Sequence, residues 1–408
     1  MIKMKTLNCR ICGWKTGKTF VDLGNTPLSN SYLKKNMIKN EKKIPLHALI
    51  CTKCMLVQLE EFETPKKIFS EYAYFSSYSK TWLKHAEEYV NKMTKKFNLN
   101  SDHLVIEIAS NDGYLLQYFK KHKIPVLGIE PAKNVAKIAQ KKKIPTITKF
   151  FGTKLAKEMV KSGKQPDLLL GNNVLAHVPK LNDFVEGLKI LLKHEGVITL
   201  EFPHILQLID KNQFDTIYHE HFSYFSLITL KKLFEMHELK IFDVEKLNTH
   251  GGSLRIFVKH KDNNVQKERK SVKKMLEKEK TFGLKKISTY TNFSQEVNSI
   301  KKELLNFLDK AKKDKKTVVG YGAPAKGNTL LNFCEINFEL IDYTVDISPH
   351  KQEMYLPGSH ILIKNPNEIF KTKPDYVLIL PWNLKEEIMV QMKDIRKWGG
   401  KFVIPIPE

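Results

Sequence analysis

Two C-x-x-C pairs near the amino terminus constrain the fold more than any other feature of the sequence. They are formed by Cys9 with Cys12 and by Cys51 with Cys54. Each pair places two sulfurs within reach of one ion, and two pairs complete the tetrahedral shell that zinc prefers. Because a shell of four thiolates has no open position, we expect a structural zinc ion that takes no part in the chemistry.

Length and composition set the broad class of the protein. A chain of 408 residues is long enough for roughly two to four domains, and 42% hydrophobic with 27% charged residues is typical of globular proteins. The sequence has no apolar run long enough for a transmembrane helix, and its first residues lack the apolar core of a signal peptide. We therefore expect a cytoplasmic protein without a membrane partner, in which paired thiols bind metal rather than form disulfides.

The net charge of +24 allows two interpretations. One is a polyanionic partner such as RNA, DNA or an acidic membrane, and the other is a surface that is solvated mainly by lysine. The lysines are spread over every segment, and no segment resembles a nucleic-acid-binding module. We expect no nucleic-acid partner, although the excess charge would help to attract a phosphorylated small molecule.

The middle of the chain predicts a strand–loop–helix–strand unit. A run of branched residues at 104–108 is typical of a buried parallel strand, and a loop, a helix at 114–119 and a second strand at 126–129 follow it. The second strand ends at Glu130. Ligands of doubly wound sheets bind at the carboxyl ends of the strands, where a carboxylate can accept both hydroxyls of a ribose.

The first loop of this unit favours a methyl donor over a dinucleotide. It contains one glycine rather than the G-x-G-x-x-G that lets a backbone approach a pyrophosphate. Its pattern, Glu107-x-x-Ser110-Asn111-Asp112-Gly113, suits S-adenosylmethionine, which has no phosphate and carries two cationic groups. Acidic neighbours such as Glu107 and Asp112 would favour those cations. The alternative is a generic α/β domain with a chance loop.

Candidate acid–base residues follow two later strands, which we expect at 167–174 and 196–201. His177 lies just past the first of them, and the segment 218–221 reads Tyr-His-Glu-His. The two histidines of that segment are two residues apart and would not share a helix face, which disfavours a metal site. Acid–base work fits better, because imidazole titrates near neutral pH, an adjacent glutamate can orient it and a phenol can donate to a developing oxyanion.

The last third of the chain predicts a second α/β lobe. Apolar residues from Phe293 to Leu308 keep helical spacing within a lysine-rich stretch, so one stripe of a helix packs inward. A strand at 317–320 then enters a glycine loop before a helix near Asn328, whose free N–H groups can hold phosphate with help from Lys326. The alternative is a tight packing turn. Further strands are expected at 340–345, 376–380 and 402–404.

These motifs, in this order, closely resemble those of the nucleotide-sugar C-methyltransferases, three-domain enzymes that make branched deoxysugars. The resemblance covers almost the whole chain and rests on the paired C-x-x-C, the tyrosine-serine segment 72–79, the loop 107–113, the segments 172–178 and 218–221, and the glycine loop 320–328. It implies a zinc-binding domain over 1–70, a Rossmann-like class I S-adenosylmethionine-dependent methyltransferase domain over 71–258, and a second Rossmann-like α/β lobe that binds a nucleotide sugar over 259–408.

The same resemblance implies a substrate and a role for individual residues. The substrate is a nucleotide-linked 4-keto-6-deoxyhexose, methylated at carbon 3 through an enolate during the biosynthesis of deoxysugars for surface glycans or natural products. His221 looks like the general base, with Glu220 beside it. The groups that look placed around the enolate oxygen are Tyr218 and His177, with Tyr72 or Tyr74 as a further pocket residue. The residues that look like donor contacts are Glu107, Ser110, Asn111, Gly113, Glu130 and Asn173. Those that look like contacts of the sugar nucleotide are Gly322, Lys326, Asn328 and Asp346.

Two other functions stay open at this point. One is methylation of a different small phosphorylated or sugar-like acceptor at oxygen or nitrogen. The other is a basic RNA-binding methyltransferase or a zinc-bearing adaptor, against which the acid–base segment and the phosphate-friendly lobe argue. We expect a monomer.

Overall fold

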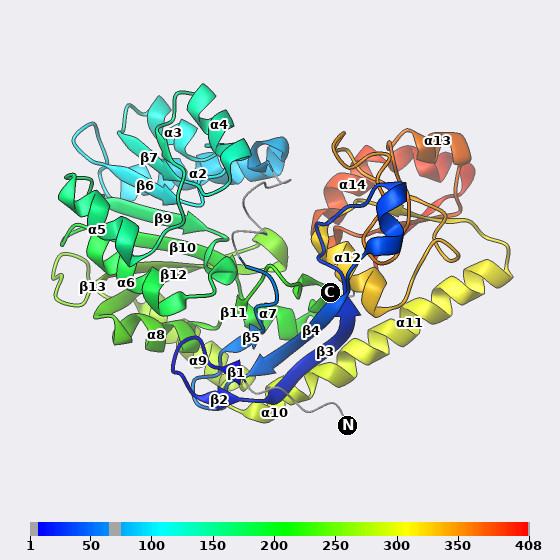
Figure 1. Ribbon diagram of the computed structural model, residues 1–408, viewed down its shortest axis with the longest axis horizontal. Helices are drawn as coiled ribbons and strands as arrows, with labels where there is room; N and C mark the ends of the chain where they lie inside the picture. The colour runs from blue at the N-terminus through cyan, green and yellow to red at the C-terminus, as the bar shows by residue number, and fades with distance from the viewer. Residues whose placement is uncertain (1–6, 65–74, 407–408) are drawn as a thin grey trace.

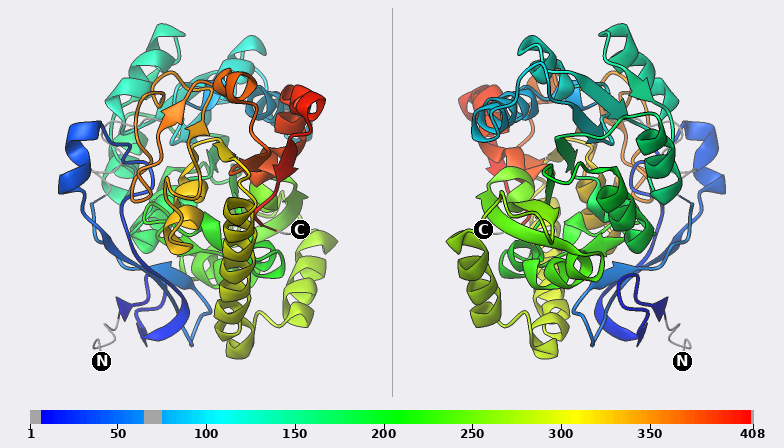
Figure 2. Two further views of the ribbon diagram at one scale, coloured as in Figure 1. Left: turned by 90° about the vertical axis from the view of Figure 1, so that its right-hand side faces the viewer. Right: turned by 90° about the vertical axis from the view of Figure 1, so that its left-hand side faces the viewer.

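The amino-terminal sheet is antiparallel and takes its last strand from the middle of the chain. The computed structural model describes residues 7–64 and 75–406 (Figure 1). The sheet has the order β11-β5-β4-β3, with strands β3 (Lys18–Thr26), β4 (Ile44–Ile50), β5 (Val57–Leu59) and β11 (Ser223–Tyr224). A small hairpin of β1 (Leu7–Asn8) and β2 (Lys15–Thr16) carries the first cysteine pair. The side views show these strands on one flank of the molecule (Figure 2).

The central sheet has seven strands in the order β12-β13-β10-β9-β6-β7-β8. Its strands are β6 (Val105–Ile108), β7 (Val126–Ile129), β8 (Thr146–Ile147), β9 (Leu168–Asn172), β10 (Val197–Pro203), β12 (Leu239–Leu247) and β13 (Ser253–His260). The five strands from β8 to β10 are parallel, whereas β13 is antiparallel to both of its neighbours. Both faces of β6 and β9 are buried, as their unbroken apolar runs predict.

Helices cover both faces of this sheet. On one face Val105 and Leu168 pack against α2 (Lys80–Lys96) and α3 (Leu116–Lys121). On the other face Ile106 and Leu169 pack against α5 (Thr153–Lys161), α6 (Leu181–Leu191) and α8 (Leu227–Met236). Successive strand residues thus point to opposite faces. The remaining helices of this region are α4 (Lys133–Lys141) and α7 (Ile205–Asp210).

The carboxy-terminal lobe is a five-stranded parallel sheet in the order β16-β15-β14-β17-β18. Its strands are β14 (Val318–Tyr321), β15 (Thr344–Val345), β16 (Ile363–Lys364), β17 (Tyr376–Ile379) and β18 (Lys401–Val403). Its helices are α12 (Ala325–Phe333), α13 (Glu368–Thr372) and α14 (Lys385–Gln391). The chain reaches it through α9 (Lys270–Phe282), α10 (Ile287–Thr291) and α11 (Phe293–Lys313).

The apolar stripe predicted for 293–308 is buried and forms the inward face of the long helix α11. Its first residue, Phe293, stacks on Phe20 of the amino-terminal sheet, with ring centroids 4.8 Å apart. The α/β class, the parallel strands and this helix are therefore confirmed. The division into 1–70, 71–258 and 259–408 stays a prediction, and β13 runs across its second boundary. Within the described residues, no helix combines the length and low polarity that a membrane crossing requires.

Candidate active site

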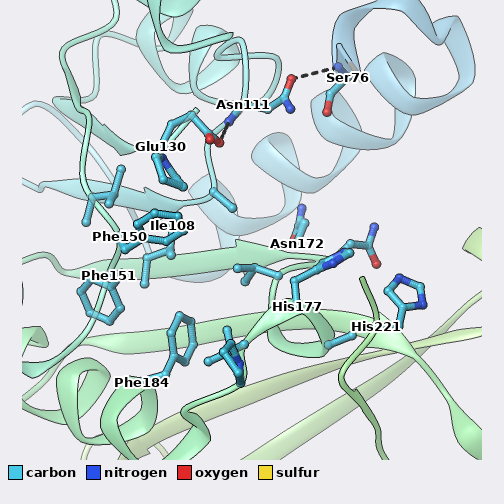
Figure 3. A pocket seen from close by; sticks show the side chains of 18 of the residues that line it. Ser76, Ile108, Asn111, Glu130, Phe150, Phe151, Asn172, His177, Phe184 and His221 are labelled. Atoms are coloured by element: carbon cyan, nitrogen blue, oxygen red, sulfur yellow. Dashed lines mark hydrogen bonds between the residues drawn. The ribbon is translucent and has the colours of Figure 1, made fainter. Parts of the chain in front are cut away.

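A cavity of about 850 Å³ opens at the carboxyl ends of the central strands. Ile108, Glu130 and Asn172, which end or follow β6, β7 and β9, lie in its wall. The amino-terminal region contributes Asn30 and the carboxy-terminal lobe contributes Lys326. All three parts of the chain therefore meet at one site. Glu130 and three phenylalanines lie toward one end of the cavity, and His177 and His221 lie toward the other (Figure 3).

Four residues of this wall have a left-handed backbone conformation. Ala109, Asn111, Asn173 and His250 have positive φ angles of 58°, 49°, 54° and 54°, and all four line the cavity. Residues with a Cβ atom rarely adopt this conformation, which costs about 1 kcal/mol or more each. Strained residues gathered around one cavity indicate a functional site.

Glu130 lies at one end of the cavity. Its carboxylate is 6% exposed and accepts the backbone N–H groups of Asn111 at 3.0 Å and Ala132 at 2.8 Å. Burial raises the pKa of Glu130 to about 7. A carboxylate at this position can also accept the hydroxyls of a ribose. Three aromatic side chains line the cavity beside it, namely Phe150, Phe151 and Phe184 (Figure 3).

The predicted donor loop divides into residues that face the cavity and residues that shape the loop. Asn111 lines the cavity, and its Oδ1 accepts the backbone N–H of Ser76 at 3.0 Å. Gly113 has a φ of +74°, and a Cβ there would lie 2.4 Å from Ile144. Ser110 occupies the space that a side chain on Gly128 would need. Ser110 and Gly113 thus fix the course of the loop and do not border the cavity.

Glu107 also lies behind the cavity wall, because its side chain is fully buried in β6. Burial, opposed by a hydrogen bond from Tyr114, raises the pKa of Glu107 well above its usual range. Asn173 does border the cavity, and its Nδ2 lies 2.9 Å from Nε2 of His250. Three of the six predicted donor residues, Asn111, Glu130 and Asn173, therefore face the ligand space.

Tyr218 and His221 form a hydrogen-bonded pair at the other end. Nδ1 of His221 lies 2.9 Å from the carbonyl oxygen of Thr216, and Nε2 lies 2.8 Å from the Tyr218 hydroxyl. Because a carbonyl can only accept, Nδ1 carries the proton and Nε2 accepts from the phenol. Burial, with the neighbouring His177, lowers the pKa of His221 well below its usual value. The imidazole is neutral at pH 7 and presents a basic nitrogen.

His177 stands beside this pair. Its Nδ1 lies 2.8 Å from the backbone oxygen of Glu220, and its ring centroid is 4.8 Å from that of His221. Burial lowers the pKa of His177 to about 4, so both rings are neutral near pH 7. Because a carbonyl can only accept, the proton of His177 also lies on Nδ1, and the Nε2 atoms of both neutral imidazoles carry no proton.

The carboxylate of Glu220 accepts a hydrogen bond from Asn30, and Nδ1 of His221 is bound by Thr216 instead. Glu220 is 3% exposed, and its Oε1 accepts from Nδ2 of Asn30 at 2.7 Å. Burial raises the pKa of Glu220 to about 7. The sequence suggested that Glu220 orients the imidazole, whereas the carbonyl of Thr216 does so here. Glu220 instead ties the segment 218–221 to the amino-terminal region.

Three other cavity residues carried no sequence signal that singled out their side chains. Asn172 is 7% exposed, and both polar atoms of its amide lack a partner among the described residues. Trp82 lies with its ring centroid 5.1 Å from that of His250. His250 sits in the turn between β12 and β13, where no periodic pattern exists. Of these three residues, only Asn172 lies in one of the family motifs, the segment 172–178.

Three consecutive residues of the carboxy-terminal glycine loop line the cavity, namely Pro324, Ala325 and Lys326. Lys326 donates to Oδ1 of Asn383 at 2.7 Å and lies 4.3 Å from the ring centroid of Trp382. Trp382 in turn donates to Asp215 at 2.6 Å, close to the carbonyl that orients His221. Burial lowers the pKa of Lys326.

The other three predicted substrate residues hold the loop in place. Asp346 accepts the backbone N–H of Ala323 at 2.8 Å, and Asn328 donates to the backbone oxygen of Ser29 at 2.6 Å. Gly322 has a φ of +90° and leaves no room for a side chain, because a Cβ would lie 2.5 Å from Pro381. None of the three lines the cavity. The predicted pocket residues Tyr72 and Tyr74 lie outside the described residues.

The four paired cysteines converge as the sequence predicts. Their sulfurs all lie within 4.8 Å of one another, with 3.4 Å between those of Cys9 and Cys54 and 3.6 Å between those of Cys12 and Cys51. Bonds of about 2.3 Å to a tetrahedral zinc ion would separate the sulfurs by about 3.8 Å. The cluster therefore fits a bound zinc ion with a closed shell.

Comparison with known proteins places the whole chain in one family. Residues 9–69 match a putative zinc binding domain, residues 82–244 a methyltransferase domain and residues 248–407 a C-methyltransferase C-terminal domain. The C-methyltransferase NovU of Streptomyces niveus is 34% identical over 403 residues, which cover 98% of this chain and 95% of NovU. The chain belongs to the C-methyltransferase family with an amino-terminal zinc-binding domain. It is an S-adenosylmethionine-dependent C-methyltransferase, so its acceptor atom is carbon rather than oxygen or nitrogen.

Two of the matching solved structures cover part of the chain. Magnesium protoporphyrin IX methyltransferase from Synechocystis PCC 6803 is 15% identical, with a TM-score of 0.34, and the match covers 44% of this chain and 79% of that one. The PH0226 protein from Pyrococcus horikoshii OT3 is 12% identical, with a TM-score of 0.37, over 49% of this chain and 99% of that one.

Proposed function

We propose that the enzyme methylates carbon 3 of a nucleotide-linked 4-keto-6-deoxyhexose. The single observation that carries this proposal is the Tyr218–His221 pair, which shares one cavity with the donor loop and Glu130. Methylation of carbon needs a carbon nucleophile. A ketone supplies one, because the carbonyl at carbon 4 acidifies the hydrogen on carbon 3 and spreads the charge of the resulting enolate.

In this mechanism His221 acts as the general base. The carbon 3–hydrogen bond breaks, its electron pair enters the enolate, and the proton goes to Nε2 of His221. Tyr218 then exchanges its bond with Nε2 for a bond to the enolate oxygen, and His177 would border this oxygen while its own proton stays on Nδ1, bound to the backbone oxygen of Glu220. Neutral imidazole suits this step, because a protonated ring could not accept the proton. Hydrogen bonds aimed at the enolate oxygen stabilise the charge as it develops.

S-adenosylmethionine, when bound, supplies the electrophilic methyl group that the enolate carbon takes up. Glu130 would accept its ribose hydroxyls, Phe150, Phe151 and Phe184 would flank its adenine, and Asn111 and Asn173 would border it. Glu107, Ser110 and Gly113 support the loop from behind.

The sugar nucleotide would enter between the methyltransferase domain and the carboxy-terminal lobe. Lys326 brings the positive charge that suits a diphosphate, and Gly322, Asn328 and Asp346 keep its loop in position. Tyr72 or Tyr74 would add to the sugar pocket. We place the reaction in the cytoplasm, because a four-thiolate metal site suits a reducing compartment. We further propose a monomer with no nucleic-acid partner.

The test is to incubate the enzyme with isotopically labelled methyl donor and a panel of nucleotide-ketosugars. Mass spectrometry and NMR then locate the label. The proposal requires the label on carbon 3 of a 4-keto-6-deoxy sugar and release of the carbon-bound hydrogen into deuterated solvent. Label on another atom, or no acceptor in the panel, would contradict it.

A further inference from the structure

We propose that Arg10, inside the first zinc-binding pair, is a positioning residue for His221. The zinc site would then contribute to catalysis indirectly, by holding the base in place. This inference rests on the proposed role of His221 as the base, but its structural part can be tested separately. One chain of contacts links the cysteines to the segment 218–221.

Arg10 lies between two of the zinc-binding cysteines and reaches the residue that follows His221. Its Nη1 donates to the backbone oxygen of Phe222 at 3.1 Å. Its guanidinium carbon also lies 5.5 Å from the ring centroid of Phe222, close enough for a cation–π contact. A charged donor on a buried carbonyl is stronger than an ordinary amide donor, so this contact restrains the backbone of Phe222.

The zinc-bearing region holds the same carbonyl a second time. The backbone N–H of Leu59 donates to the oxygen of Phe222 at 3.0 Å. The next two residues form β11, in which Ser223 pairs with Gln58 and Tyr224 pairs with Val57. Gln58 is fully buried, and its Oε1 accepts the backbone N–H of Arg10 at 3.0 Å. Arg10 and β5 thus act as one clamp on the chain immediately after His221.

The clamp adds restraints that the hydrogen bonds of His221 itself do not provide. The hydrogen bonds of His221 itself are local, to Thr216 at Nδ1, to Tyr218 at Nε2 and from its N–H to the backbone oxygen of Tyr218 at 2.9 Å, while the ring of His177 packs beside it. Thr216 and Tyr218 belong to the same loop and move with it. The contacts at Phe222, together with the Glu220–Asn30 and His219–Pro45 hydrogen bonds, join this loop to the amino-terminal region. They therefore fix where the imidazole stands relative to the donor site.

The zinc ion would anchor the other end of the clamp. The turn that carries Arg10 is also held by Asn182, whose Nδ2 donates to the backbone oxygens of Arg10 at 3.0 Å and Ile11 at 3.1 Å. With metal bound, the four sulfurs lock this turn to the loop of Cys51 and Cys54. Without metal, only Asn182 and Gln58 would hold the backbone of Arg10.

The experiment compares Arg10→Met and Arg10→Lys with a matched control, Lys53→Met. Lys53 is the basic residue inside the second cysteine pair, but its exposed side chain lies only against Trp14, with the amine 5.6 Å from the ring centroid. Zinc content is measured first, and each variant should retain the zinc of the parent protein. Hydrogen–deuterium exchange of peptides covering 217–226 and residue 59 then measures how firmly the clamp holds these residues, independently of activity.

We expect Arg10→Met to exchange faster over 217–226 and to lower kcat by about 10- to 100-fold, with an unchanged KM for the methyl donor. Arg10→Lys should recover part of the protection from exchange and part of kcat, since lysine keeps the charge and one donor. Lys53→Met should match the parent protein. If Arg10→Met does not fold, removal of zinc from the parent protein with a chelator should accelerate exchange over the same peptides.

Two results would overturn the inference. One is zinc-loaded Arg10→Met with the exchange and the kcat of the parent protein. The other is a lower kcat with unchanged exchange over 217–226, which would mean that Arg10 acts in some way other than positioning. Should His221→Ala retain turnover, the proposed base would be wrong, while the exchange data would still report whether the clamp exists.

Discussion

The hydroxyl of Tyr218 donates a 2.8 Å hydrogen bond to Nε2 of His221, and the ring centroids of the two side chains lie 4.0 Å apart. The basic nitrogen of the site is thus occupied by a phenol until a substrate arrives. The phenol keeps the imidazole in one orientation and becomes available to a substrate oxygen when it leaves Nε2. The pair therefore links proton removal to stabilisation of the charge that results.

Tyr218→Phe removes the donor and keeps the ring. We expect kcat to fall by about 100-fold, because the enolate oxygen loses a hydrogen bond and His221 loses a restraint. The KM for the methyl donor should not change. Steady-state kinetics with each substrate varied in turn measure both quantities. A Phe variant with the kcat of the parent protein would exclude the phenol from the reaction.

The pH dependence of kcat should reflect the buried imidazoles. His221 has a pKa well below its usual value, and the pKa of His177 is about 4. The base works only when neutral, that is, above its pKa. Turnover at saturating substrate should therefore stay level as the pH falls through 6.5 and should decline only at lower pH. Loss of half the activity near pH 6.5 that persists in Glu130→Gln and Glu220→Gln, which remove the carboxyls with pKa values of about 7, would instead indicate a histidine with an ordinary pKa.

Asn172→Asp distinguishes two tasks for an amide that has no protein partner among the described residues. If its N–H donates to the developing enolate, a carboxylate in its place repels that charge, and we expect kcat to fall by about 100-fold. Donor affinity, measured by calorimetry, should then be kept. Tighter donor binding with little loss of kcat would show that Asn172 faces the ammonium group of the donor. The exposed Asn298→Asp, on α11, serves as the control.

Glu220→Gln tests the cost of a buried carboxylate. The folded-state pKa of Glu220, about 7, exceeds its ordinary value of 4.5, so the folded protein binds the extra proton more tightly than the unfolded chain. Its contribution to stability is full below pH 4.5 and is lost as the pH rises through 7, by up to about 3 kcal/mol. Glutamine keeps the acceptor for Asn30 without the charge. Denaturant unfolding should show the variant more stable than the parent protein at pH 8 and similar to it at pH 4.5. A variant that is less stable at pH 8 would contradict this account.

Sequence patterns predicted the features that depend on residues close together in the chain. The strands around Glu130 and His177 follow from runs of apolar residues, and parallel strands bring their carboxyl ends to one edge. Those two residues therefore border one cavity, although they are 47 positions apart in the chain. The spacing of the cysteines likewise predicted the metal cluster, since each pair is a local unit.

What the sequence could not show depends on packing between distant segments. Asn30 reaches Glu220, and Arg10 reaches Phe222, only because β11 joins the amino-terminal sheet. Nothing in the segment 218–221 indicates that Glu220 binds Asn30 rather than His221. His250 enters the cavity from a strained turn, a position that tertiary contacts determine and local propensity disfavours.

Hydrogen exchange at carbon 3 tests the central claim most directly. The nucleotide-ketosugar is incubated in deuterated water with the enzyme and S-adenosylhomocysteine, so that proton removal occurs without methyl transfer, and NMR follows the carbon-bound hydrogen. We expect the parent protein and His219→Gln, whose histidine lies 3.0 Å from the backbone oxygen of Pro45, to exchange it. His221→Ala should exchange it at least about 100-fold more slowly, with unchanged donor affinity. Exchange by His221→Ala at the parent rate would contradict the account.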